Sequence, residues 1–383
     1  MKEKLPIRMR ILLSFFILAI GGREVKCMKQ RENTTRVLMN VQVNKTIMVE
    51  GGDVYDCIGL NVQPAFNHPL LKNHKIQMEP SSLPLSTYTE SPSVRASSQS
   101  QLPIVECHAG TIPVLRNYRK DYMATKTIDG VIGKDVQQEA AGIRYRDELY
   151  GTRARINVYE PKVKTDSKDM SASCIQINGG PGVGRRDGLG VGSWVYPSYS
   201  GDNFARFHVY WDDGLPTKTC IDHDCPAFVQ VSQSVGLGGR IIPISIYNGP
   251  QYEIDVQIFK DPKTKNWWVT YGEQNTPIGY WPSSLFHYMT DKGDFAFWGG
   301  YVQGPTAMTD SPQMGSGHFA SEGFGKASFT KNIQIVDKNN MLITPNFHRA
   351  DPGGTNFSKY TIEGYKVSSY GMHMYYGGPG DLV

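Results

Sequence analysis

The sequence predicts an all-β protein, an antiparallel sandwich or barrel, with a small attachment at its N-terminus. Beyond Ala141 apolar residues alternate with polar ones, as in Arg153–Tyr159 and Tyr252–Ile258, so one face of each run is apolar. Such short runs, separated by turn signals, continue along the chain, which is typical of sandwiches and barrels. Only Pro282–Met289 is predicted to be helical, because proline stands near its start and Gly293 follows its end.

The same alternation predicts further strands. They are Phe204–Trp211, Phe228–Val235, Arg240–Tyr247, Asn266–Tyr271, Lys326–Val336 and Met372–Tyr376. A chain of 383 residues is long enough for one large domain with a full core and the attachment. The net charge of +4 is too small to indicate a nucleic-acid partner, and no basic run is interleaved with aromatic residues.

The first 22 residues have the pattern of a secretory signal peptide. Basic residues between Lys2 and Arg10 precede the apolar run Ile11–Ile20, and Gly21 and Gly22 follow it. The run is too short to span a bilayer comfortably. We therefore expect a secreted, extracellular protein with no membrane segment in its mature form, and a retained signal anchor is the alternative.

Secretion permits disulfides, and the six cysteines are interpreted accordingly. We predict a local bridge between Cys220 and Cys225, which close a very short loop between two strand-like runs. A second bridge is predicted between two cysteines of the N-terminal attachment, Cys57 and Cys107. The cysteines without an assigned partner are Cys27 and Cys174. Sequons at Asn33, Asn44 and Asn356 fit a glycosylated surface.

The N-terminal attachment is predicted to occupy residues 23–140. Its segment Asp56–Met78 is compact, and the prolines in it forbid a long helix. Residues 79–101 are rich in Ser, Thr and Pro and are interpreted as a linker. From Asn117 to Ala140 charge is high and periodicity poor, so we place a domain boundary or processing site there, with the β-domain over 141–383.

A glycine-rich stretch between aromatic residues, Asp294–Phe329, is the first candidate site. Glycines let the backbone turn sharply and pack close to large rings, which suits the floor of a β-walled cleft. A tightly packed β corner is the alternative. Within this stretch His318 follows Gly315–Gly317, which lacks the Gly-x-Ser-x-Gly pattern of a nucleophile, so we interpret His318 as structural.

Two other motifs are interpreted as loops. The run Asn178–Gly184 suggests a phosphate-binding loop, because successive backbone amides can cradle an anion, but the Lys-Ser/Thr ending and a following helix are missing. The acidic and imidazole groups of Asp222–Asp224 suggest a metal site, yet ligands so close together cannot all face one ion. We predict no metal and no cofactor.

Carboxylates of the β-domain are the remaining candidates for chemistry. Hydrolysis by an activated water needs one carboxylate to accept a proton and a second group to stabilise the oxyanion or to protonate the leaving group. The acidic residues available for these roles include Asp187, Asp212, Asp213, Glu253 and Glu322. Spacing alone does not choose among them.

Long, specific motifs run through both parts of the chain. In the attachment they are Cys57, Gln63–Met78 and Cys107–Pro113. In the β region they are Gly192–Pro197, Phe207–Trp211, Cys220–Phe228, Gly279–Pro282, Trp298–Gly300, Gln313–Phe329 and Tyr376–Gly380. The first set closely resembles the activation peptide of plant neprosin-type proteins, and the second set resembles the neprosin domain.

The resemblance implies an antiparallel β-sandwich of the concanavalin or lectin-like kind, with a cleft on one face. It implies a secreted precursor whose N-terminal domain covers that cleft until it is removed, often in acid, and a location in the apoplast or cell wall. Active members of the family are glutamic endopeptidases that cleave after proline, using two glutamates and an activated water.

Both glutamate positions differ in this chain. The family stretch Ile-Glu-Ala-Gly-Trp-x-Val-x-Pro corresponds to Leu189–Pro197, which puts Gly190 in place of the first glutamate. The second glutamate follows Trp-Gly-Gly directly, and here Tyr301 follows Trp298–Gly300. Neither glycine nor a tyrosine with a pKa near 10 can activate water in mildly acid medium. The third family disulfide, near the C-terminus, is also missing, because Asp381–Val383 contains no cysteine.

The sequence therefore predicts a neprosin-like protein that keeps the precursor architecture and the cleft but has lost the peptidase chemistry. Such a protein would bind proline-rich peptides or cell-wall polymers, with its own N-terminal domain over the cleft. An active peptidase remains the alternative if Asp187, three residues before Gly190, has replaced the lost carboxylate with help from Glu322. A lectin-like module that binds carbohydrate is the third hypothesis, because fold alone does not decide function.

Overall fold

A computed structural model describes residues 43–86, 97–116, 137–182, 185–212, 219–368 and 371–381. All of them belong to the unit Gln42–Val383. The predicted signal peptide, Cys27 and the sequon at Asn33 lie outside the described residues. Within the described ranges, no helix has the length and apolar character needed to cross a membrane.

Seven strands form the smaller sheet of the β-domain, and each pairs antiparallel with its neighbours. In spatial order they are β11 (Thr219–Ile221), β10 (Arg206–Asp212), β9 (Arg185–Val195), β8 (Met170–Gly182), β16 (Gly293–Gly304), β6 (Gln137–Leu149) and β19 (Ala350–Gly354). The sequence boundary expected at Ala141 falls inside β6.

The larger sheet contains eleven strands. Its main path is β12 (Val229–Gln230), β15 (Thr276–Trp281), β14 (Trp267–Tyr271), β13 (Tyr252–Lys260), β7 (Gly151–Asn157), β17 (Ser328–Val336), β18 (Met341–Ile343) and β3 (Leu85–Ser86). Off this path, β21 (Gly371–Gly377) pairs with β17, β20 (Thr361–Ser368) pairs with β21, and β4 (Ser98–Gln99) pairs with β13. Among the strands of the described residues, only β3 and β4, both from the N-terminal attachment, pair in parallel with a neighbour.

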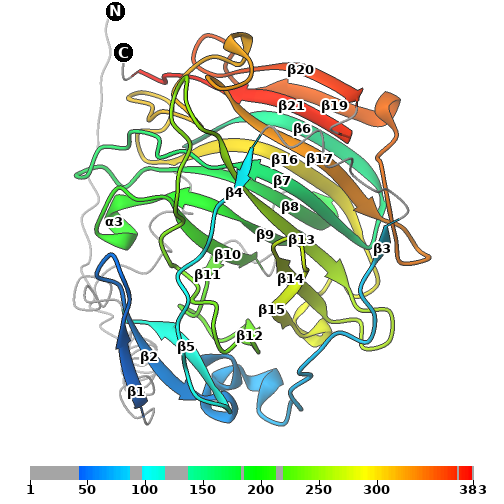
Figure 1. The fold of residues 1–383 in the computed structure, drawn as a ribbon. Coiled ribbons are helices and arrows are strands. Elements are labelled where there is room, and N and C mark those ends of the chain that lie inside the picture. The colour runs from blue at the N-terminus through cyan, green and yellow to red at the C-terminus, as the bar shows by residue number, and fades with distance from the viewer. Residues whose placement is uncertain are drawn as a thin grey trace, which may run out of the picture. The chain divides into compact units, whose positions relative to one another are not determined.

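The main core lies between these two sheets, because it takes apolar side chains from both. The smaller sheet contributes, among others, Ile143, Ile175 and Val209, and the larger sheet contributes Ile156, Ile254 and Ile335. Trp298 of β16 is fully buried, and its indole N–H donates to Thr152 Oγ1 of β7 at 2.7 Å, which joins the sheets by a polar contact. The predicted all-β sandwich is confirmed (Figure 1).

A third, separate sheet belongs to the N-terminal attachment, in the order β1 (Val43–Met48), β2 (Val54–Gly59) and β5 (Thr111–Leu115) (Figure 1). Three short 3-10 turns follow β2, namely η1 (Leu60–Val62), η2 (Pro64–Asn67) and η3 (Pro69–Leu71). Prolines begin the second and third turns, where their missing N–H costs nothing. The stretch 79–101 differs from a plain linker, because both of its described ends form strands with the β-domain.

Two sequence predictions of local structure are wrong. The predicted helix Pro282–Met289 is only the 3-10 turn η6 (Ser283–Leu285). The backbone N–H groups of His287 and Met289 donate to the Asp187 carboxylate, at 2.8 and 2.9 Å, instead of to a preceding helical turn. The predicted strand Arg240–Tyr247 is irregular, and Pro243 inside it has no N–H for a ladder.

Three smaller corrections concern short elements. The predicted strand Phe228–Val235 shrinks to β12. A four-residue helix that periodicity does not reveal, α3 (Pro197–Ser200), follows β9, with Pro197 at its start and Gly201 at its left-handed C-cap with φ of 88°. Further 3-10 turns are η7 (Ala320–Glu322) and η8 (Phe347–Arg349).

Candidate functional site

One face of the seven-stranded sheet carries a second apolar cluster, separate from the main core, and we call it the site face. Its buried members are Met170, Ala172, Cys174, Trp194, Tyr196, Tyr199, Ile221, Phe297 and Tyr301, with Ala140, Tyr210 and Phe295 packed against them. Side chains alternate along a strand, so Gly190 lies on the same face as Trp194. The structure therefore places both positions of the expected glutamates, 190 and 301, on one face of one sheet.

Position 190 has no room for a side chain. Gly190 of β9 lies directly opposite Tyr210 of β10. A Cβ atom built on Gly190 would lie 2.0 Å from Cε1 of the Tyr210 ring, where real Cβ atoms are never found. The tyrosine ring thus occupies the space in which a glutamate side chain would begin.

Position 301 holds a buried phenol. The Tyr301 side chain is 5% exposed. Burial first, and then the nearby Cys174 and Tyr210, raise its pKa well above its usual value near 10. Burial also raises the pKa of Tyr210 well above that value. Both phenols stay protonated at any physiological pH and neither can act as a general base there.

Cys174 lies between the two positions. It pairs with Gly192 of β9 and with Gly299 of β16, so it is flanked by glycines on both sides. Burial raises the pKa of its thiol to about 12. Because the thiolate is the reactive form of cysteine, this thiol is a poor nucleophile in the native fold.

Asp187 lies on the opposite face from Gly190, which three residues of separation require in a strand. It is fully buried, and its Oδ2 accepts backbone N–H bonds from His287, Tyr288 and Met289 at 2.8, 2.5 and 2.9 Å. Its carboxylate therefore anchors the loop after η6. The structure does not bring it together with position 190.

Glu322 lies in a different, half-exposed cluster. It accepts a hydrogen bond from the hydroxyl of Tyr247 at 2.7 Å and bonds His318 Nδ1 at 2.9 Å. The rings of Tyr247 and His318 stack with centroids 4.0 Å apart. Burial raises the pKa of Glu322, but the bonds from Tyr247 and His318 outweigh that effect and lower it below its usual value. This carboxylate is held in its charged form, and His318 is its partner.

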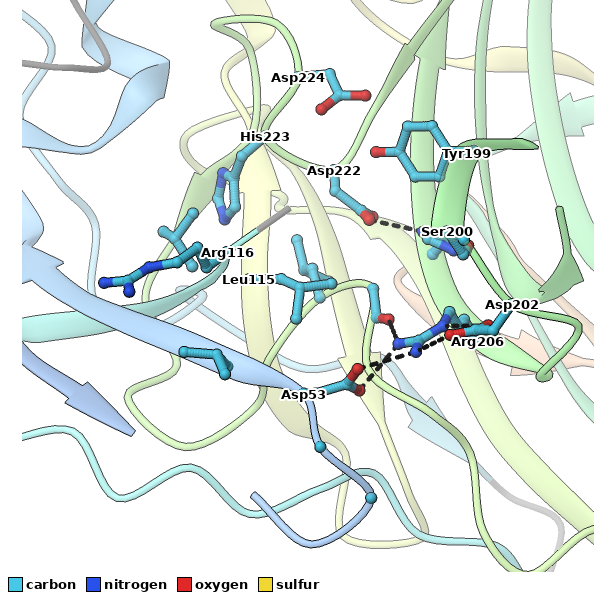
Figure 2. Close-up of a pocket in the computed structure, with 18 residues that line it drawn as sticks. Asp53, Leu115, Arg116, Tyr199, Ser200, Asp202, Arg206, Asp222, His223 and Asp224 are labelled. Atoms are coloured by element: carbon cyan, nitrogen blue, oxygen red, sulfur yellow. Dashed lines mark hydrogen bonds and ion pairs between the residues drawn. The ribbon is translucent and has the colours of Figure 1, made fainter. Parts of the chain in front are cut away.

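A cavity of about 310 Å³ opens at the β10 end of the site face, between the β1–β2 turn and α3 (Figure 2). Arg206 lines it and binds two aspartates, Asp202 of its own domain at 2.6 Å and Asp53 of the N-terminal attachment at 2.9 Å. Figure 2 shows the guanidinium between the two carboxylates. Arg206 thus links the N-terminal attachment, through Asp53, to the β-domain.

The Asp222–Asp224 motif also lines this cavity. The side chains of Asp222 and His223 form hydrogen bonds with other protein groups. Asp222 binds His208 Nδ1 at 2.6 Å and accepts the N–H of Val209 at 3.0 Å. His223 Nε2 bonds Gln230 Oε1 at 2.8 Å. Among the described residues, no group of three or more His, Cys, Asp or Glu side chains is placed to hold a metal ion. The His208–Asp222 pair has no signal in the sequence, because His208 lies on β10 and Asp222 lies in the turn after β11.

The glycine-rich run Asn178–Gly184 ends β8 and leads into β9, and its residues 183 and 184 lie outside the described part. The N–H of Gly180 donates to Asp294 Oδ2 at 3.0 Å, so an acidic side chain takes one of the amides that an anion would need. This contact agrees with the interpretation of the run as a connection between strands.

Both predicted disulfides, Cys57–Cys107 and Cys220–Cys225, are confirmed. Cys174 is a buried free thiol. Of the sequons, Asn44 lies exposed on the edge strand β1. The Asn356 side chain is half-buried, and its Nδ2 donates to Glu139 Oε1 at 3.2 Å.

Comparisons with known proteins agree with the sequence motifs. The Neprosin family model matches residues 167–379, and the Neprosin activation peptide model matches residues 46–152. Among solved structures, the chain is similar to Scytalido-glutamic peptidase with a peptide-based transition-state analogue, at 10% identity and a TM-score of 0.34 over 63% of this chain and 98% of that one. It is similar to SCP-B, a member of the Eqolisin family of peptidases in complex with the tripeptide Ala-Ile-His, at 10% identity and a TM-score of 0.32 over the same shares. Because the Neprosin match extends over most of the β-domain and the activation-peptide match precedes it, this protein belongs to the Neprosin family.

Proposed function

We propose that this protein is a secreted member of the Neprosin family without peptidase activity, which binds an extended proline-rich peptide on its site face. The observation that carries the proposal is the Tyr210 ring in the space of the first expected glutamate, 2.0 Å from a Cβ at position 190. The second position holds a protonated, buried phenol at Tyr301. One acid or base group commonly contributes about 10²–10⁴-fold to a rate, so losing both removes the chemistry.

The contacts of Asp187 and Glu322 argue against a relocated carboxylate. Asp187 faces away from position 190 and uses one oxygen for three backbone N–H groups. Glu322 is paired with His318 and Tyr247. An active peptidase would need one of these groups to release its partners and reach the site face.

Partly accessible aromatic rings support a peptide ligand. Tyr210 and Phe295 are the half-buried rings of the site face, and the guanidinium of Arg146 lies 5.0 Å from the centroid of Phe295. Proline-rich segments dock on aromatic surfaces of this kind, because their extended conformation is preformed and their rings pack on flat side chains. A cell-wall polysaccharide would use the same rings, and the experiment below includes it.

The test of catalysis is turnover of a proline-containing fluorogenic peptide by the acid-treated full chain. We expect none from the wild type. The variant Gly190→Glu/Tyr210→Ala/Tyr301→Glu restores both carboxylates and the space for the first, and any gain of turnover in this variant supports the assignment of the two positions. Circular dichroism of each protein checks that it is folded. Robust turnover by the wild type would disprove the loss of catalysis.

The test of binding is titration of a fluorescent proline-rich peptide, with a soluble cell-wall polysaccharide as a second probe. We expect saturable peptide binding that Phe295→Ala weakens. Phe357→Ala is the matched control, because Phe357 is 60% exposed and is not a member of the site face. Binding of the polysaccharide alone would favour the lectin-like alternative, and binding of neither probe would remove the ligand proposal.

A further inference from the structure

The segment that carries β4 completes the larger sheet. One side of β13 pairs with β7 from Glu253 to Phe259. The other side pairs with β14 only from Val256 to Lys260. β14 does not reach the first residues of β13. There β4 pairs in parallel with Tyr252 and Glu253 instead (Figure 1). The N–H groups of Ser98 and Ser100 donate to the carbonyls of Gln251 and Glu253, at 2.9 and 2.8 Å. The N-terminal attachment thus supplies a strand that the β-domain lacks.

A buried carboxylate depends on the same segment. Glu253 is 1% exposed, and it accepts hydrogen bonds from Ser97 Oγ at 2.5 Å and from Gln99 Nε2 at 3.3 Å. Lys331 Nζ, also buried, lies 3.0 Å from Glu253 and donates to Ser97 Oγ at 2.9 Å. Removing this segment would take two hydrogen-bond donors from a carboxylate that is buried in the intact fold, and a buried polar group that loses its partners destabilises the fold.

The contacts continue along the chain on the C-terminal side of β4. Gln101 and Ile242 exchange backbone hydrogen bonds at 2.7 and 3.1 Å, and the N–H of Val105 donates to Ser234 O at 3.0 Å. Leu102 and Val105 are 7% and 0% exposed. Extended pairing and apolar burial therefore hold the whole stretch from Ser97 to Val105.

Separate contacts hold the residues that precede β4, at Gln63 and at Ser81. Gln63 and Gln230 exchange hydrogen bonds at 3.1 and 2.8 Å inside the protein. Asp261 accepts bonds from the N–H and the hydroxyl of Ser81 at 2.5 and 2.7 Å. The Cys57–Cys107 disulfide ties this stretch to the one that carries β4. Release of the attachment therefore requires all of these contacts to break together.

We propose that residues 43–116 stay bound to the β-domain at pH 7 even when the chain between them is cut, with Ser97–Val105 as the segment that complements the larger sheet. A cut in the chain between Arg116 and Gln137 then gives a stable two-chain protein and no free β-domain. The inference does not depend on whether the site face has activity, so its test is independent of the proposed function.

The experiment uses the full chain with a site-specific protease sequence inserted between residues 116 and 137, where no described contact is interrupted. After cleavage at pH 7, we expect both fragments in a single size-exclusion peak, with the thermal midpoint of the uncut protein. Non-reducing electrophoresis shows that no disulfide joins the fragments, because each described disulfide lies within one of them. Elution of the 43–116 fragment apart from the rest would overturn the proposal, whatever the state of the remainder.

A matched pair of variants tests the role of the Ser97 side chain, next to β4, in the cleaved protein. Ser97→Ala removes the hydroxyl that bonds Glu253 and Lys331, and we expect the fragments to dissociate about tenfold faster, since a hydrogen bond to a charged group is worth about 1.5 kcal/mol or more. Ser98→Ala is the control, because the exposed Ser98 side chain points away and its backbone pairing is kept. Equal dissociation rates in the two variants would exclude a role of the Ser97 hydroxyl in holding the fragments together.

Discussion

The ring of Tyr210 fills the space that any side chain at residue 190 would need, with Cε1 2.0 Å from the place of a Cβ. The two residues face each other across neighbouring strands, so a side chain at residue 190 requires the Tyr210 ring to leave its place. A single glutamate restored at residue 190 would therefore meet a ring and not an open cleft.

We accordingly predict that Gly190→Glu alone destabilises the protein by about 1–3 kcal/mol, the usual cost of overpacking. Chemical denaturation of the wild type, Gly190→Glu and Gly190→Glu/Tyr210→Ala measures this effect, with Tyr210→Ala as the control. The double variant is expected to be more stable than the sum of the two single changes. Additive effects would show that the ring and the new side chain do not collide.

Asp187→Asn tests the structural role of that carboxylate. We expect a loss of about 3 kcal/mol of stability, because Asp187 accepts three hydrogen bonds, each worth about 1.5–3 kcal/mol to a charged group, and the neutral amide oxygen of asparagine accepts the same bonds more weakly. Glu322→Gln, on the half-exposed surface, is expected to stay within about 0.5 kcal/mol of the wild type. Unchanged stability of Asp187→Asn together with a changed rate of peptide cleavage would instead favour the relocated catalyst.

Acid should weaken the attachment of the N-terminal segment at Asp261. Burial raises the pKa of this carboxyl, but hydrogen bonds from Ser81, Thr264 and Lys263 outweigh it and lower the pKa below its usual value. Since the folded-state pKa is depressed, the stability that Asp261 contributes is complete above its unfolded-state pKa of about 3.9 and is lost as the pH falls through the folded value.

Urea midpoints between about pH 2.5 and 6 measure this dependence. We expect Asp261→Asn to be less stable than the wild type at pH 6 and to lose less stability on acidification below about pH 4. Ser98→Ala, which changes an exposed side chain and no carboxylate, is the control and should leave the pH dependence of stability unchanged. If the urea midpoints of the wild type and of Asp261→Asn fell with pH in parallel, Asp261 would not be the carboxylate that weakens the attachment in acid.

The two disulfides should differ in their contribution to stability. They close loops with sequence separations of 50 and 5 residues. Loop-closure entropy then predicts a loss of about 4 kcal/mol for Cys57→Ser/Cys107→Ser and about 2 kcal/mol for Cys220→Ser/Cys225→Ser. Denaturant unfolding of each double variant checks the order. A larger loss from the short loop would show that packing around Cys220 outweighs chain entropy.

Cys174 should resist alkylation in the native protein. Burial hides its thiol and raises the pKa of the thiol to about 12, so little thiolate is present at pH 8. In a Cys27→Ser background, we expect iodoacetamide to label residue 174 only after denaturation, as read by mass spectrometry. Rapid labelling of the folded protein would show that the site face opens in solution.

Much of the fold follows from local patterns. Alternation predicts β7 and β13 because each places one apolar face on the core, and short spacing predicts the Cys220–Cys225 bridge. The helix expected at Pro282–Met289 fails, because the remote Asp187 takes the N–H groups that would have formed it. The opposite faces of Asp187 and Gly190 follow from their odd spacing, a signal that the sequence contains.

The sequence by itself determined that residues 190 and 301, to which the neprosin resemblance assigns the two glutamates, are glycine and tyrosine, because the type of a residue can be read without the fold. Only the tertiary structure decided which side chains surround these two positions. The Tyr210 ring reaches position 190, and Ser97 reaches Glu253, across strands that are distant along the chain. Sheet register brings such pairs together, and register is set by the packing of all the strands at once.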